Sequence, residues 1–543
     1  MKRKPERCLF NASEEIFVSP WRVPFLFLMN HQKGGFIMLR CKQISVIAIF
    51  LFLALIFSSR TALTQQLTPA MKDAIAWADN LKPVYNEVAK YIWDNPELSL
   101  VEFKSSAKLQ EYLAGNGFTI EKGVANMPTA FVATWGSGKP VIGILGEFDA
   151  LPNLSQEAGV TSQKPIIPGG PGHGCGHNLF GTSSATAAIA AAKAMEVHGI
   201  KGTVKFFGTP AEETLVGKIY MNRDGVFDGT DIMLAWHPGD WNGVSYDTNL
   251  AMDNVKFRFY GKSSHAGNAP AAGRSALDAV ELMNIAMNYM REHIIQEARI
   301  HYVITKGGES PNVVPAFAEV WYFIRAPRRA QVDQIRAWMF DVAKGAALMT
   351  QTKVENQILT AAYERLTNRT LAMAGDKIAK LIGSPPFTAE DQKFGEAVVQ
   401  EALKSDLKGE AFSNKIETPD FTKIFPNVSS RRSSADDNYT WKFPSVRFFA
   451  ATWTRGTSQH SWPAVCQTGT PTSVKAGLTV SKYMAALALE LMTNPKLIQD
   501  AWEEHKKYIA EFGYKETIPP EVKVPSFEDL YGIKPEAVPG AKK

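Results

Sequence analysis

Residues 169–178 read GGPGHGCGHN, and the interpretation of the fold starts from this loop. His173, Cys175 and His177 alternate within it, and the glycines between them let the backbone bring a thiolate and an imidazole to one point. A metal site is one interpretation of this pattern. A buried cysteine and a solvated histidine in a turn are the other, and the loop alone does not choose between them.

Three predicted strands around this loop end in ionisable side chains. They are residues 141–145 (VIGIL) followed by Asp149, residues 202–207 (GTVKFF) followed by Glu212 and Glu213, and residues 231–236 followed by His237. A helix of small residues, able to pack closely on a sheet, is predicted at 181–194. Because ligands bind at the carboxyl ends of strands in open α/β sheets, these side chains are expected at one edge of one sheet.

The middle of the chain predicts a separate α+β domain. It has a β-α-β-β-α order, with strands at 255–260, 300–306 and 318–325 and helices at 275–290 and 331–346. Around this insert, helices are predicted at 68–94, 371–381, 392–403 and 472–492, and a strand at 446–449. The charged, Pro-containing residues 496–543 are expected to form a peripheral tail.

The N-terminal segment predicts export. Residues 44–57 (ISVIAIFLFLALIF) are apolar, follow Arg40 and Lys42, and are too few to span a bilayer comfortably. We therefore expect residues 38–66 to be a signal peptide and residues 1–37 to be an upstream extension, so that the protein is periplasmic or secreted. An uncleaved membrane anchor is the alternative, because no clean A-x-A cleavage site follows.

Composition narrows the classes further. A chain of 543 residues is too long to fold around a single hydrophobic core, so two or more domains are expected. Its composition, with 45% hydrophobic and 21% charged residues, is ordinary for a globular protein. A net charge of +5 gives no reason to expect a nucleic-acid partner. The four cysteines are too few for a disulfide framework.

The candidate metal ligands are Cys175, His177, Glu213, His237 and His460. Five donors of mixed type are too many for one tetrahedral zinc and suit two ions that share a bridging thiolate. Glu212 could then take a proton from metal-bound water and pass it to a leaving nitrogen, while Asp149 orients a ligand imidazole. Thiolate and imidazole donors favour zinc, with manganese as the alternative because carboxylates are also present.

Seven motifs together resemble the M20 family of metallo-amidohydrolases and peptidases. They are GEFDALP, GHGCGHN, GTPAEE, WHP, GKSSHAG, SPNVVPAFAEV and TSQHSW. The resemblance covers roughly residues 70–495 and is strongest to the branch of the aminobenzoyl-glutamate hydrolases and the N-acyl-amino-acid amidohydrolases. One departure is Asn178 after His177, where many relatives have aspartate.

The resemblance implies a role for each matching residue. Cys175 would bridge the metals, His177, Glu213, His237 and His460 would complete the ligands, and Glu212 would be the general base. His265 in GKSSHAG would reach the active site of a neighbouring protomer and stabilise the oxyanion. Asn312 and Arg325 would contact the substrate carbonyl and carboxylate, against the alternatives of a turn residue and an ordinary strand-end arginine.

The implied architecture is a two-domain α/β protein. A catalytic sheet domain of the phosphorylase/hydrolase-like aminopeptidase type would comprise residues 68–250 and 366–495. A ferredoxin-like lid, residues 251–365, would be inserted in it and form a homodimer.

We therefore expect a two-metal amidohydrolase that cleaves an N-acyl or N-aroyl amino acid, aminobenzoyl-glutamate-like, or a related small amide. A dipeptidase or carboxypeptidase on the same scaffold is the alternative, and a non-catalytic binding protein is disfavoured because Glu212 is present. Neither a G-x-S-x-G elbow nor an HExxH helix occurs in the chain, which disfavours a serine hydrolase and a zincin.

Overall fold

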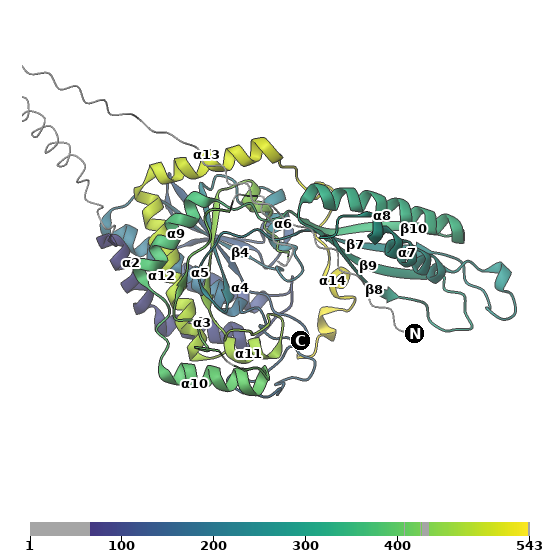
Figure 1. The fold of residues 1–543 in the computed structure, drawn as a ribbon, viewed down its shortest axis with the longest axis horizontal. Helices are drawn as coiled ribbons and strands as arrows, with labels where there is room; N and C mark the ends of the chain where they lie inside the picture. The colour runs from purple at the N-terminus through teal and green to yellow at the C-terminus, as the bar shows by residue number, and fades with distance from the viewer. Residues whose placement is uncertain (1–65, 407, 424, 426–433, 541–543) are drawn as a thin grey trace, which may run out of the picture. The chain divides into compact units, whose positions relative to one another are not determined.

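The structure is a computed structural model that describes residues 66–543 except 407, 424, 426–433 and 541–543 (Figure 1). The described residues do not include the predicted upstream extension, with Cys8. They include only the last residue of the predicted signal segment, so Cys41 also lies outside them. Among the residues that are described, no helix is long and apolar enough to cross a membrane.

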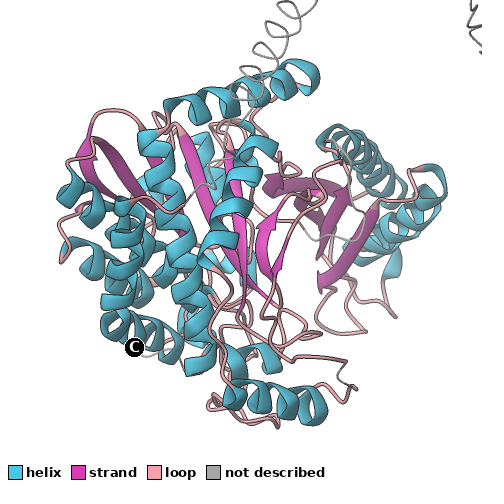
Figure 2. Cartoon of the chain, turned by 60° about the vertical axis from the view of Figure 1, so that its left-hand side comes forward, coloured by secondary structure: helices cyan, strands magenta, loops and turns pink. Residues whose placement is uncertain are grey.

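The larger sheet carries the candidate site. Within the described residues it has eight strands in the order β1-β2-β4-β3-β5-β12-β6-β11. Figure 2 shows strands in magenta with helices packed around them. The four central strands run parallel: β4 (Gly202–Thr209), β3 (Val141–Glu147), β5 (Ile232–Gly239) and β12 (Ser445–Ala451). β3 is buried along its whole length, as its apolar sequence predicts. Since the strands are parallel, their carboxyl ends meet at one edge.

The outer strands of this sheet pair mostly in antiparallel register. They are β1 (Thr119–Lys122), β2 (Phe131–Ser137), β6 (Asn242–Ser245) and β11 (Ile416–Glu417). β1 pairs with β2, β2 with β4, and β6 with β12 in antiparallel register, whereas β11 runs parallel to β6. The sheet is therefore mixed at its edges and parallel where the ionisable side chains emerge.

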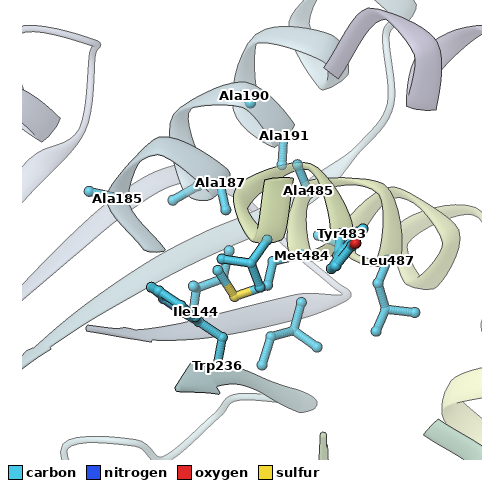
Figure 3. Close-up of a cluster of buried hydrophobic side chains, with 14 of the residues drawn as sticks. Ile144, Ala185, Ala187, Ala190, Ala191, Trp236, Tyr483, Met484, Ala485 and Leu487 are labelled. Carbon is cyan, nitrogen blue, oxygen red and sulfur yellow. The ribbon is translucent and has the colours of Figure 1, made fainter. Parts of the chain in front are cut away.

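Two helices of small residues form the centre of the core. α5 (His177–His198) and α12 (Pro471–Thr493) pack against each other and against the sheet (Figure 3). Alanines of α5 face Tyr483, Met484 and Leu487 of α12, with Ile144 and Trp236 of the sheet beneath them. Small side chains let two helices approach closely, and this packing fixes the start of α5, where the Gly-rich loop ends.

Further helices surround this centre. They are α2 (Pro69–Asn80), α3 (Lys82–Asp94), α4 (Phe103–Ala114), α6 (Gly217–Arg223), α9 (Arg369–Ile382), α10 (Ala389–Ala397) and α11 (Trp462–Thr468). The prediction of one helical element over 68–94 is wrong, because the chain breaks at Leu81 into α2 and α3. Pro83 near the start of α3 explains the break, since proline is compatible with the first helical turn and not with a helix interior.

The smaller sheet has the antiparallel order β10-β7-β9-β8. Its strands are β7 (Ala251–Tyr260), β8 (Arg299–Lys306), β9 (Phe317–Ala326) and β10 (Lys353–Ala362), and α7 (Ala276–Met290) and α8 (Arg329–Thr350) pack on one face. The predicted strands and helices are confirmed. β10 was not predicted, because its first half is polar, and it completes the β-α-β-β-α-β order of a ferredoxin-like unit. The domain boundaries drawn from the sequence stay predictions.

The chain after α12 is not peripheral, and that expectation is wrong. It forms α13 (Pro495–Phe512) and α14 (Phe527–Tyr531), and the side chains of Ile518 and Leu530 are buried. In α13 the apolar residues Leu497, Ala501, Tyr508 and Phe512 do recur at helical spacing, and the sequence prediction overlooked them. After α13 the apolar residues lie irregularly among charged residues and prolines and give no periodic pattern. Their burial is therefore a property of the tertiary structure.

The packing of α12 makes a testable prediction at Gly477. A Cβ added there would lie 1.9 Å from the Tyr85 hydroxyl and 2.8 Å from Ser183 Oγ. We expect Gly477→Ala to lower the free energy of unfolding by about 1–3 kcal/mol, because the helix must shift to relieve the clash. Gly345→Ala in α8 is the matched control, since nothing lies within 4 Å of its Cβ, and it should raise the free energy by about 0.5–1 kcal/mol. Urea unfolding measures both, and a Gly477→Ala protein as stable as the parent would contradict the packing.

Candidate metal centre

The Gly-rich loop enters the carboxyl edge of the larger sheet. Cys175 lies just before α5, and His177 is the first residue of that helix. Gly176 between them has φ 74°, and a Cβ there would lie 2.9 Å from Pro238 next to His237. A glycine is therefore required where the loop passes close to the end of β5.

Two sets of ligand atoms meet at the Cys175 thiol. Cys175, His177 and His237 form one set, and Cys175, Glu213 and His460 form the other. Within each set all ligand atoms lie within 4.8 Å of one another, and Cys175 Sγ lies 3.4 Å from His237 Nε2. The geometry thus brings together the five predicted ligands and fits two metal ions that share one thiolate.

Asp149 contacts a residue of each ligand set. Its carboxylate is fully buried, and Oδ1 lies 2.9 Å from His177 Nδ1. Oδ2 accepts hydrogen bonds from the backbone N–H of Glu213 at 2.9 Å and from the Ser99 hydroxyl at 3.0 Å. A donor at His177 Nδ1 leaves Nε2 free to face a metal, which is how a carboxylate selects the tautomer of a ligand histidine.

Glu212 lies beside the ligands and not among the two sets. Its Oε2 is 3.8 Å from His177 Nε2, and it belongs with Glu147 and His177 to a third group of close ligand atoms found among the described residues. Burial raises the pKa of the Glu212 carboxyl well above its usual range, and the nearby Glu147 carboxylate adds to the rise. A carboxyl whose proton affinity is raised in this way suits a base that must also return its proton.

The sequence did not predict a buried group of charged residues near Glu212. Lys218 Nζ is fully buried and lies 2.6 Å from both Glu147 Oε1 and Asp436 Oδ1. The motif GEFDALP indicated a carboxylate at Glu147, at the end of β3, without indicating a partner. No pattern in the sequence links Lys218 to Asp436, since more than two hundred residues separate them.

The unpaired atoms of the site fit a metal. Glu147 Oε2, His177 Nε2 and Glu213 Oε1 are buried and accept or donate no hydrogen bond, although Glu147 Oε2 and His177 Nε2 are only 3.1 Å apart. Buried polar atoms are rarely left without partners. His177 and Glu213 belong to different ligand sets, so an ion in each set would offer these two residues the missing partner.

The electrostatics around His460 also favour the binding of cations. Burial opposes protonation of His460, but hydrogen bonds to Cys175 and Glu213 outweigh it and raise the His460 pKa to about 11. In the metal-free cluster an imidazole thus takes up positive charge where the thiol and a carboxylate converge. A divalent ion supplies that charge without a proton.

The remaining predicted residues lie elsewhere. His173 is buried, contacts the Ile92 carbonyl at 3.1 Å, and has its pKa lowered to about 3 by burial, so it belongs to the core. His265 and Asn312 are exposed on adjacent loops of the smaller-sheet unit, where Ala266 N–H donates to the Asn312 carbonyl. The contacts of the described residues do not join His265, Asn312 or Arg325 to the ligand cluster, and their roles stay predictions.

Comparisons with known proteins identify a matching family model and similar proteins. Residues 251–348 match the family model of the peptidase dimerisation domain. A p-aminobenzoyl-glutamate hydrolase component of Escherichia coli (strain K12) is 40% identical over 464 residues, covering 82% of this chain and 95% of that protein. The Xaa-Arg dipeptidase of Mus musculus is 30% identical over 322 residues, covering 56% of this chain and 69% of that protein.

A solved structure shares the fold at low sequence identity. A putative aminohydrolase from methicillin-resistant Staphylococcus aureus superposes with a TM-score of 0.56 at 19% identity. The superposition covers 78% of this chain and 99% of that one. The two-domain α/β architecture expected from the sequence is confirmed.

The shared thiolate predicts unequal losses of metal. Cys175→Ala removes a ligand from both sets, so we expect it to lower metal content at both positions. His460→Ala removes a ligand from one set, and we expect about one ion per chain to remain. Elemental analysis after dialysis against dilute metal measures both variants. Undiminished metal in Cys175→Ala would rule out a bridging thiolate.

Proposed function

Because the chain belongs to the M20 family and is a metal-dependent amidohydrolase, we propose that its substrate is an N-acyl or N-aroyl amino acid with a free carboxylate. The observation that carries the mechanism is the meeting of two ligand sets at Cys175 with Glu212 beside them. The E. coli relative named for p-aminobenzoyl-glutamate supports an aroyl group on the acyl side and glutamate on the amine side.

Cys175, His177 and His237 would hold one ion, and Cys175, Glu213 and His460 the other. When bound, such ions lower the pKa of water and polarise a carbonyl. We propose zinc, because thiolate and imidazole are its preferred donors, with manganese as the alternative that Glu213 favours.

Glu212 moves the proton. Its carboxylate takes a proton from the attacking water and returns it to the departing nitrogen, so that the amine leaves as a neutral group. Lys218 stabilises the negative charge of Glu147 next to it, which limits the repulsion that Glu212 meets when it ionises. Asp149 keeps the His177 ring in one orientation throughout.

The lid would complete the site from a second protomer. We propose a homodimer formed through residues 251–348, in which His265 donates to the oxyanion of the neighbouring active site. Support comes from the exposure of His265, whose Nδ1 accepts the backbone N–H groups of Gly267 and Asn268. Those two hydrogen bonds fix Nε2 as the donor.

Arg325 is suited to the substrate carboxylate. It lies on β9, its Nε is buried without a hydrogen-bond partner, and burial lowers the pKa of its guanidinium. Its neighbour across the strand pair is Arg299, so no carboxylate of the paired strand neutralises it. A guanidinium in this state gains a strong, charge-assisted interaction when a carboxylate arrives.

A dipeptidase is the second candidate, which the likeness to the mouse Xaa-Arg dipeptidase favours. The two candidates differ in the group next to the scissile carbonyl. A dipeptide has a free amine there, whereas an N-acyl amino acid has none. Parallel rate measurements on p-aminobenzoyl-glutamate, N-acetyl amino acids and dipeptides distinguish them.

We also propose that the protein acts outside the cytoplasm, on the basis of the charged and apolar segment 38–66. An exported amidohydrolase would release amino acids from amides that the cell meets in its surroundings.

Replacing the base gives the direct test of mechanism. We expect Glu212→Gln to lower kcat by about 10²–10⁴-fold, because the amide cannot take up the proton. Its metal content should equal that of the parent, since Glu212 lies outside the two sets that meet at Cys175. Glu87→Gln, an exposed glutamate, controls for the change of charge. Full activity in Glu212→Gln would contradict the role of Glu212 as the general base.

Replacing Arg325 tests the substrate class. We expect Arg325→Met to raise KM for a carboxylate substrate by about 10–100-fold with kcat nearly unchanged, because a charged hydrogen bond present throughout the reaction is lost. The control is the same substrate with its carboxylate converted to a carboxamide, on which parent and variant should differ little. Equal KM values for the carboxylate substrate would exclude Arg325 from binding it.

A further inference from the structure

The turn that carries Glu212 and Glu213 has a tight backbone. Ala211, the residue before Glu212, is fully buried and has φ 54°, a conformation that residues other than glycine rarely adopt. The turn is also closely packed on itself, since a Cβ added at Gly217 would lie 1.7 Å from the Pro210 carbonyl oxygen. A backbone in such a conformation persists only where neighbouring groups hold it in place.

Two buried carboxylates hold this turn. Asp149 accepts the backbone N–H of Glu213 at 2.9 Å, and Glu102 Oε1 accepts the backbone N–H of Ala211 at 2.8 Å. Glu212 lies between the two residues whose N–H groups are held, so its backbone is fixed from both sides. The sequence predicted a supporting role for Asp149, whereas it gave no signal for Glu102.

The Glu102 carboxylate is itself fixed in place. Glu102 is fully buried directly before the first residue of α4, and its Oε1 also accepts the Leu100 N–H at 2.9 Å. Its Oε2 accepts the Thr129 hydroxyl at 2.8 Å. Thr129 is tied to α4 in turn, because its carbonyl accepts the Ser106 hydroxyl at 2.7 Å. The carboxylate therefore cannot rotate without losing three hydrogen bonds.

The connection between α3 and α4, residues 95–102, reaches both carriers of the site. Ser99 donates to Asp149 at 3.0 Å, and the Glu97 carbonyl accepts the Ala150 N–H at 2.7 Å. These contacts join the connection to the segment after β3, while Glu102 joins it to the turn after β4, the neighbouring parallel strand. One connection thus links the two strand ends from which Asp149 and the glutamate pair come.

We propose that Glu102 is a positioning residue for the candidate metal centre, which holds the N–H of Ala211 and so sets where the Glu212 and Glu213 side chains begin. Glu213 belongs to one ligand set, and Glu212 is the proposed base. A change in the backbone at Ala211 would move both side chains, and a displacement of about 1 Å is enough to lower a rate by about 10²-fold. This inference rests on the metal-dependent function proposed above.

The bond from Ala211 needs an acceptor and does not need a charge. Burial raises the pKa of the Glu102 carboxyl to about 8, and the charge of Asp149 adds to the rise. Oε1 accepts an N–H group in both the ionised and the neutral carboxyl. Glu102→Gln keeps such an acceptor, whereas Glu102→Met removes it at nearly the same side-chain length. The two substitutions therefore separate the hydrogen bond from the charge.

Competition for Zn²⁺ tests the inference. The Zn²⁺-loaded whole chain is titrated with a chelating dye. We expect Glu102→Met to hold one ion about 10–100-fold more weakly and the other with the affinity of the parent, because Glu213 belongs to only one ligand set. Glu102→Gln should keep both affinities. Glu364→Met is the matched control and should also keep both, since Glu364 is a buried carboxylate that accepts a backbone N–H from Arg329.

Thr129→Val provides a second variant, which removes one donor to Glu102 and leaves the carboxylate in place. We expect it to weaken the same ion by a smaller factor, and it decides the question if Glu102→Met does not fold. Parent-like affinities in Glu102→Met or, in its absence, in Thr129→Val would overturn the proposal. So would equal weakening of both ions, or a loss in Glu102→Gln as large as in Glu102→Met.

The dye measures metal on the chain without substrate, so this test is separate from the test of the proposed function. Parent-like affinities in the Glu102 variants, together with lost activity in Glu212→Gln, would overturn the role of Glu102 and leave the proposed function intact. A chain that shows the expected affinities and cleaves none of the tested amides would contradict the proposed substrate class alone.

Discussion

The carboxylate of Asp149 is buried at the carboxyl end of β3, where a charge without partners would be costly. Its partners come from three parts of the chain: the His177 ring at the start of α5, the backbone N–H of Glu213 after β4, and the Ser99 hydroxyl after α3. Burying this group therefore requires those three segments to meet. Their meeting sets the distance between the ligand loop and the Glu212–Glu213 pair.

A second buried charge network lies under the base. Lys218 is surrounded by Glu147 and Asp436, and the three side chains are almost completely excluded from solvent. Ion pairs of this kind seldom add stability over apolar packing, because desolvation offsets the attraction. The network lies next to Glu212, where the Lys218 ammonium offsets part of the negative charge of the neighbouring carboxylates. This offers a functional reason for the cost.

The two sheets have different tasks in this arrangement. The larger one carries the candidate ligands at the carboxyl ends of its parallel strands. The smaller one and its loops carry His265, Asn312 and Arg325, which no contact among the described residues joins to the ligand cluster. The C-terminal segment after α13 joins, through Ile518 and Leu530, a buried cluster to which both sheets contribute. A segment whose composition resembles a solvated tail is in this way part of the core that supports the metal centre.

The sequence by itself determined the strands that lead to Asp149, Glu212 and His237, the helices of small residues, and the candidate ligands that the structure brings together around Cys175. Each of these depends on local order: an apolar run predicts a buried strand, and residues that follow it are carried to the strand's end. Only the tertiary structure decided that Lys218 pairs with Asp436, that Ser99 donates to Asp149, and that β10 completes the smaller sheet. Those partners are distant in the chain, and a hydrogen bond or ion pair between distant residues leaves no periodic trace in the sequence, because the packing of the elements alone brings its two halves together.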